Sequence, residues 1–139
     1  YLTGVQFEVG STASTFENRS YGTELALCQR YYYAQSSSGI NQSIGNFSVY
    51  SGSALYGVVP FKVTMRTSPS LVTSAGGTDF VFYCNGNAYN GNNFGLQASG
   101  LNAYVVYSPN GTFGGSAGQS GWIQTNSSGA YMAFTAELL

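Results

Sequence analysis

Histidine is absent from this chain of 139 residues, and charged side chains are scarce. Lys and Arg total 4 and Asp and Glu total 5, so 6% of the residues are charged, against about 25% in an average globular protein. Histidine supplies most general bases near neutral pH and many zinc ligands. Its absence excludes Ser/His/Asp and Cys/His catalytic arrangements, and the sequence contains no GxxxxGK phosphate loop.

The low number of cations also excludes classes of partner. Four Lys and Arg residues cannot form the basic stripe that binds nucleic acid, so we expect no nucleic-acid partner. No apolar run approaches about 18 residues, so we expect no membrane insertion. The chain begins at a tyrosine with no leader segment, which indicates a fragment or the mature part of a longer chain.

The acidic residues show no motif for catalysis. Glycoside hydrolysis needs two carboxyl groups at a defined separation, and none of the acids is closely paired with another: Glu8, Glu17, Glu24, Asp79 and Glu137. We therefore expect no enzyme activity, no catalytic residues, no cofactor and no metal. The cations fit either solvated surface charges or ion pairs around a helix, Arg19 with Glu24 and Arg30 with Glu17.

The two cysteines, Cys28 and Cys84, are far apart and lack a CxxC partner. Each lies among apolar residues, which favours buried free thiols, with a disulfide as the alternative.

Aromatic and small polar residues are abundant instead. The chain is 43% hydrophobic and has 12 Tyr and 9 Phe, which excludes disorder and predicts a single folded domain over residues 1–139. One helix is expected over residues 23–30, with Thr23 as its cap, followed by a strand that ends near Gln35. The other segments that read as strands are 1–10, 47–50, 55–65, 71–73, 80–84, 94–97, 103–107, 122–125 and 131–138.

Short strands at even spacing favour an all-β fold, an antiparallel β-sandwich of jelly-roll type with one short helix near the N-terminus. The last strand is the clearest. In residues 131–138 Met132, Phe134, Ala136 and Leu138 fall on one face, and the other four residues fall on the opposite face.

Residues 85–100 are rich in Asn and Gly. A hairpin loop is one reading, because Asn-Gly is a strong hairpin signal. A binding loop is the other, because amides beside aromatic rings suit uncharged, hydroxyl-rich ligands. The candidate ligand-binding residues are Tyr89, Asn92, Asn93, Phe94 and Gln97, with Phe113 and Trp122 in or beside similar loops.

Residues 4–35, GVQFEVGSTASTFENRSYGTELALCQRYYYAQ, resemble a segment that opens a C-terminal domain in many bacteriophage tail-fibre and other virion proteins. The matching stretches are 7–10, 16–17, 19–22 and 24–32, and 59–72, 121–124 and 131–139 look like later landmarks. Ser14 and Thr15 stand where Thr-Pro is commoner, and Asn18 where a His is common.

The resemblance implies a module on the exterior of the virion. Such a module has no catalytic residues, and its middle, residues 85–119 here, varies between relatives. It supports a tail-fibre tip that binds host glycan, or a capsid decoration module without a ligand; a carbohydrate-binding module is a third alternative. It also implies other virion proteins as partners and a homotrimer, for which the aromatic, charge-poor composition argues independently. We expect residues 31–33 and 131–138 near the trimer axis.

Overall fold

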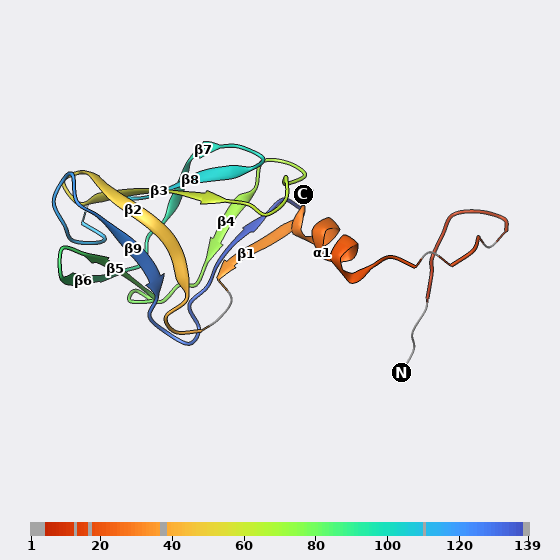
Figure 1. Cartoon of the computed structure of the whole chain (residues 1–139), viewed down its shortest axis with the longest axis horizontal. Coiled ribbons are helices and arrows are strands. Elements are labelled where there is room, and N and C mark those ends of the chain that lie inside the picture. Colours follow the sequence, from red (N-terminus) through yellow and green to blue (C-terminus); the bar gives the residue numbers. More distant parts are fainter. Residues whose placement is uncertain (1–4, 13, 17, 37–38, 110, 138–139) are drawn as a thin grey trace.

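The computed structural model describes residues 5–12, 14–16, 18–36, 39–109 and 111–137. They form one helix and ten strands (Figure 1). In chain order the elements are α1 (Tyr21–Gln29), β1 (Tyr32–Ser36), β2 (Ser43–Ser51), β3 (Ala54–Pro60), β4 (Ser70–Thr73), β5 (Phe80–Cys84), β6 (Asn87–Gly91), β7 (Gly95–Ser99), β8 (Ala103–Ser108), β9 (Ser120–Thr125) and β10 (Met132–Thr135).

The strands form two unequal sheets. The small sheet has three strands in the order β1-β10-β4, and the large sheet has seven in the order β6-β5-β9-β2-β3-β8-β7. Every neighbouring pair in both sheets is antiparallel. The predicted fold class, an antiparallel all-β sandwich with one short helix, is confirmed.

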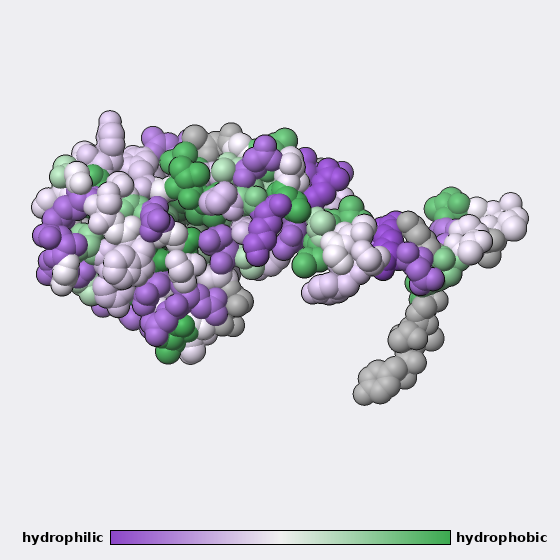
Figure 2. All heavy atoms as spheres, viewed as in Figure 1, coloured by the Kyte–Doolittle hydropathy of each residue, from purple (hydrophilic) through white to green (hydrophobic). Residues whose placement is uncertain are grey.

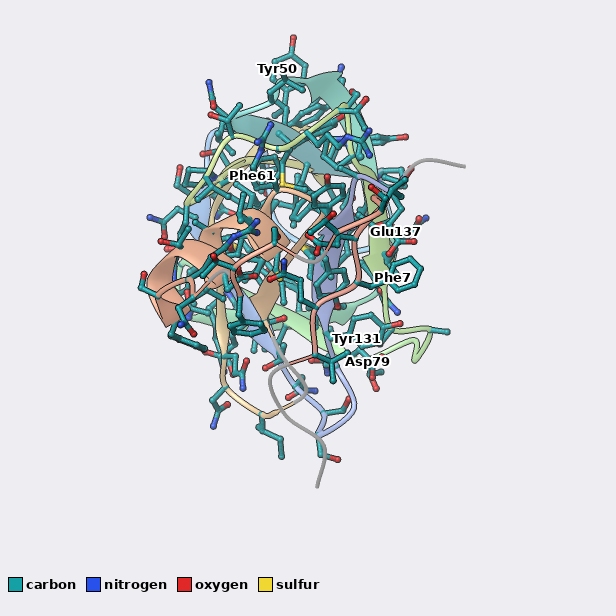
Figure 3. All side chains as sticks on the ribbon, turned by 90° about the vertical axis from the view of Figure 1, so that its right-hand side faces the viewer. Phe7, Tyr50, Phe61, Asp79, Tyr131 and Glu137 are labelled. Carbon is teal, nitrogen blue, oxygen red and sulfur yellow. The ribbon has the colours of Figure 1, made fainter. Side chains whose placement is uncertain are left out.

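Aromatic rings fill the space between the sheets. Phe61, in the loop after β3, lies 5.3 Å from the Tyr33 ring and 4.9 Å from the Phe134 ring, both in the small sheet. Its ring is also 6.1 Å from that of Tyr104 on β8 of the large sheet. Figure 3 shows Phe61 among the side chains of the body. One ring from a loop thus contacts both sheets.

The helix α1 begins earlier than predicted and is capped by a different residue. Ser20 is the N-cap, and its hydroxyl accepts a hydrogen bond from the Thr23 N–H at 3.3 Å. Thr23 itself lies inside the helix, so its predicted role as the cap is wrong. No side chain of α1 is buried, and Figure 1 shows the helix and the segment before it projecting from one end of the body.

Two predicted strands differ from the structure. Residues 5–10 form no strand although Val5, Phe7 and Val9 alternate with polar residues, because no strand lies beside them. The segment predicted as a strand over 55–65 leaves the sheet after Pro60. The Phe61 N–H still donates to the Asn102 carbonyl at 2.8 Å, but residues 61–65 form no strand. Residues 1–4 lie outside the described residues.

The Asn-Gly hairpin reading is confirmed. Asn85 and Gly86 have φ of 47° and 74°, and positive φ at both central residues is what the two-residue type I′ turn needs. The turn joins β5 to β6, a strand that the sequence did not predict. The Asn-rich segment therefore begins as part of the large sheet.

The C-terminal strand is confirmed over 132–135, and its buried face is as predicted. Met132, Phe134 and Ala136 are buried, but so is Ala133 on the opposite face, and Leu138 lies outside the described residues. Tyr33 is buried as well. β10 is the central strand of the small sheet, and the chain itself buries Met132, Ala133 and Phe134. The position of residues 31–33 and 131–138 near a trimer axis stays a prediction.

The cysteines are both free, so no disulfide joins them. Cys84 is buried as predicted, and burial raises the pKa of its thiol. The expectation that Cys28 is buried is wrong, because it lies on α1, which has no buried side chain.

We predict that Gly57→Ala destabilises the fold. A methyl group at Gly57 would come within 2.6 Å of the ring of Phe47, its partner on β2, and overpacking of this kind costs about 1–3 kcal/mol. Urea unfolding followed by circular dichroism measures the loss. Gly77→Ala is the control, because nothing lies within 4 Å of the added methyl group; equal unfolding midpoints for the two variants would contradict the prediction.

Candidate functional site

The large sheet has one face toward the core and one toward solvent. Along β9, Ile123 is buried while Trp122 is exposed. Along β2, Phe47 and Val49 are buried while Ser48 and Tyr50 are exposed. This alternation defines a solvent-facing surface, here named the outer face, that runs across neighbouring strands.

The outer face is uncharged. None of the seven strands of the large sheet contains Asp, Glu, Lys or Arg. Its polar groups are amides and hydroxyls, among them the Ser48 and Ser120 hydroxyls, which hydrogen-bond to each other at 2.9 Å across β2 and β9. A ligand on this face can therefore form hydrogen bonds and contacts with aromatic rings, but the strands offer it no charged side chain.

A stacked aromatic pair lies on one side of the outer face. Tyr83 on β5 and Trp122 on β9 are cross-strand partners, with ring centroids 5.2 Å apart and planes inclined by 19°. The Trp122 ring is 48% exposed, and its Nε1–H donates to Gln124 Oε1 at 3.4 Å. The indole is held in place while keeping about half its surface open.

A second aromatic cluster lies on the other side. The Tyr56 ring on β3 stacks on that of Tyr107 on β8 at 6.0 Å and meets the Tyr50 ring edge-on at 5.4 Å. Tyr50 is 76% exposed, and Figure 3 shows it pointing outward at the upper end of the body.

A groove of about 610 Å³ lies between the two clusters, over β2 and β3. The strand order β9-β2-β3-β8 places Trp122 on one flank and Tyr107 on the other. Its lining combines amide, hydroxyl and apolar groups: Gln35, Ser43, Ile44, Gly45, Asn46, Ser48, Tyr56, Gly57, Val58 and Pro60. The groove and the two aromatic clusters form the candidate site.

The structure separates the residues predicted to bind a ligand. Phe113 is buried, and Phe94 and Tyr89 pack against the core; the Phe94 ring lies 5.0 Å from that of Phe80 and 5.6 Å from that of Phe113. These three aromatic side chains therefore stabilise the interior. The predicted surface of ring and amide side chains in 85–119 is not assembled from them.

The remaining predicted residues are polar, apart from Trp122. Asn93 and Gln97 are exposed, whereas the Asn92 side-chain amide donates to the Ser74 backbone carbonyl and ties its loop to β4. Trp122 alone among the predicted residues belongs to the candidate site described above.

The candidate binding residues chosen from the sequence did not include Tyr50, Tyr56, Tyr83 and Tyr107. The signal that identifies them is the register. Ser48 pairs with Tyr56, and Tyr56 with Tyr107, so these side chains follow one another across one face.

Three acids of the described residues, Glu8, Glu24 and Asp79, have structural partners. Arg19 and Glu24 form the predicted ion pair, with N and O atoms 3.3 Å apart; Glu17, the predicted partner of Arg30, lies outside the described residues. Glu8 accepts hydrogen bonds from the hydroxyl and N–H of Ser14, which lower the pKa of its carboxyl. No group of three metal-ligating side chains occurs within the described ranges.

Asp79 joins two loops. Its carboxylate accepts a hydrogen bond from the Ser127 hydroxyl at 2.7 Å and from the Gly76 N–H at 2.9 Å. Hydrogen bonds from the hydroxyls of Ser74 and Ser127, with that of the Gly76 N–H, lower the pKa of Asp79. The carboxylate is thus a buried structural anion between the loops at 74–79 and 126–130.

We predict that Asp79 makes stability depend on pH in the acid range. Because its pKa is lower in the folded chain, its contribution is fully present above the pKa of the unfolded chain, about 3.9, and disappears as pH falls through the folded value. Asp79→Asn should lower the melting temperature at pH 7, and the difference from the parent should shrink below about pH 4. The exposed Glu137→Gln is the control; a difference that stays constant with pH would contradict this role.

Comparison with known proteins finds no matching family model, and no curated protein or solved structure that matches significantly. Within the described part of the chain, no helix is long and apolar enough to cross a membrane.

Proposed function

We propose that this chain is a non-enzymatic module on the exterior of a bacteriophage virion, the receptor-binding tip of a tail fibre, and that its outer face binds neutral glycan on the host surface. The observation that carries the glycan proposal is the uncharged groove between two exposed aromatic clusters. The resemblance of residues 4–35 to tail-fibre domains supports the virion assignment.

The chemistry of the groove matches that of a sugar. Sugar rings have apolar C–H faces that pack on aromatic rings such as Trp122 and Tyr56, and hydroxyls that hydrogen-bond to amides such as Asn46. Each net hydrogen bond contributes only about 1 kcal/mol. A single copy therefore binds weakly, and display of many copies on one particle raises the avidity.

The alternative is a capsid decoration or assembly module without a ligand. The exposed helix α1 and the apolar segment before it favour this reading, because they offer a surface for other virion proteins. The two roles differ in whether the outer face has a ligand, which substitutions on that face decide.

We predict that Trp122→Ala and Tyr56→Ala each weaken glycan binding about 2- to 10-fold per contact, the loss expected for one aromatic contact of about 0.5–1.5 kcal/mol. The measurement uses the protein coupled to beads at high density and exposed to an array of neutral glycans. Multivalent display amplifies the loss to a large drop in retained sugar.

The control is Tyr32→Ala, which removes a 51% exposed tyrosine from the small sheet. It should bind like the parent. Binding by the parent that survives Trp122→Ala and Tyr56→Ala together would exclude the outer face, and no binding by the parent to any glycan would favour the decoration role.

We also propose that the chain forms a homotrimer. Exposed apolar side chains gather on α1 and the segment before it, including Phe7, Tyr21 and Leu25, and closed rotational symmetry is usual for identical chains. Light scattering at micromolar concentration should give close to three times the chain mass of 14.7 kDa. A stable monomer would contradict the proposal for this part of the protein.

A further inference from the structure

The described residues between 5 and 20, here named the arm, carry three strongly exposed large apolar side chains, two of them the most exposed among the residues that the structure describes. Phe7 is 97% exposed, Val9 103% and Val5 67%. Figure 2 shows apolar side chains on the arm, clear of the body. Exposed apolar side chains in such a short segment indicate a surface that another molecule covers.

Apolar and polar residues alternate along the arm: Val5, Phe7 and Val9 with Gln6 and Glu8 between them. An arm laid out as an extended chain in a groove would therefore present an apolar side to the floor of the groove and a polar side with the Glu8 carboxylate away from that floor.

An apolar groove lies at the junction of α1 and the loop after β3. This helix groove has a volume of about 640 Å³. It is lined by small and apolar groups of α1, by two residues of the loop and by polar groups at its ends: Ser20, Gly22, Thr23, Ala26, Leu27, Arg30, Val63 and Thr64. The small side chains Gly22 and Ala26 leave room for a chain to lie against the helix.

One cation lines the helix groove, and two more lie in the loop after β3. Arg30 lines it, Lys62 precedes the lining residue Val63, and the Arg66 N–H donates to the Arg30 carbonyl at 2.8 Å. The Arg66 guanidinium lies 5.2 Å from the Tyr31 ring centroid. Arg30 is thus the one cation among the lining residues. The arm carries Glu8, whose carboxylate also accepts hydrogen bonds from Ser14, and Arg19 at its end next to α1.

We propose that the arm of one copy lies in the helix groove of a second copy, with Phe7 and Val9 against the apolar lining and Glu8 toward Arg30. The proposal rests on the proposed self-association and names the surfaces that meet. A second copy is the occupant because the arm runs from the N-terminus of α1 away from the body (Figure 1), whereas the groove is lined by α1 and by the loop after β3.

The test joins two differently substituted chains. Both carry Cys28→Ser; one adds Val9→Cys and the other Thr64→Cys, while Cys84 stays buried. After mixing, equilibration and mild oxidation, we expect a disulfide-linked pair containing one chain of each kind, seen by mass spectrometry. Such a bond forms only between copies, since neither chain holds both new thiols.

The control acceptor is Val58→Cys, a 59% exposed position on the outer face. It should give at most a small fraction of the linked pair. Equal linkage to Val58→Cys and Thr64→Cys would overturn the proposal. A further variant carries both Val9→Cys and Thr64→Cys in one chain. If its two thiols join within that chain, and no disulfide forms between separate chains, the proposal is also overturned.

Light scattering separates failure of this proposal from failure of the self-association. Phe7→Ser with Val9→Ser should shift the mass from three chains toward one, while Val72→Ser, a 38% exposed valine on β4, should leave it unchanged. A trimer that survives Phe7→Ser with Val9→Ser overturns arm docking and leaves self-association intact. A monomeric parent overturns both, and neither result changes the test of glycan binding.

Discussion

Contact between phenyl and phenol rings of two unequal sheets is the interaction on which this fold depends. Three strands cannot cover seven, so the rings of Phe61, Phe94 and Phe113 enter from loops and extend the core beyond the small sheet. Phe61 joins Phe134 of one sheet to Tyr104 of the other. The loops of this protein are thus part of its interior, and the outer face keeps the aromatic rings that the core does not use.

Formal charge is distributed unevenly along the structure. None of the ten strands contains a charged residue, whereas Arg19, Glu24, Arg30, Lys62 and Arg66 lie on α1, beside it or in the loop after β3. The body therefore has a neutral face with rings and amides, and a charged end with the helix groove and the arm. We infer that the proposed recognition and assembly functions use different ends of the molecule, so that each can be changed without the other.

The sequence predicted most of the strands, because alternation and turn residues are local signals; Asn85-Gly86 is the clearest case. It did not show which ring side chains face the core, because a glycine- and asparagine-rich context does not indicate that Phe94 and Phe113 point inward. The outer face depends on register between β9, β2, β3 and β8, which only the folded sheet provides. Residues 5–10 show that a local signal can also mislead. Their apolar and polar residues alternate as in a strand, but no neighbouring strand is present to form hydrogen bonds with them.

The charge-free outer face has a consequence for the medium in which the protein works. Screening shortens the reach of charges from about 30 Å at 0.01 M salt to about 3 Å at 1 M, but stacking and amide contacts carry no net charge to screen. The glycan contacts proposed for Trp122 and Tyr56 are therefore expected to keep their strength from dilute to saline water. The charged end, with its half-exposed Arg19–Glu24 pair, is the part of the molecule that responds to salinity.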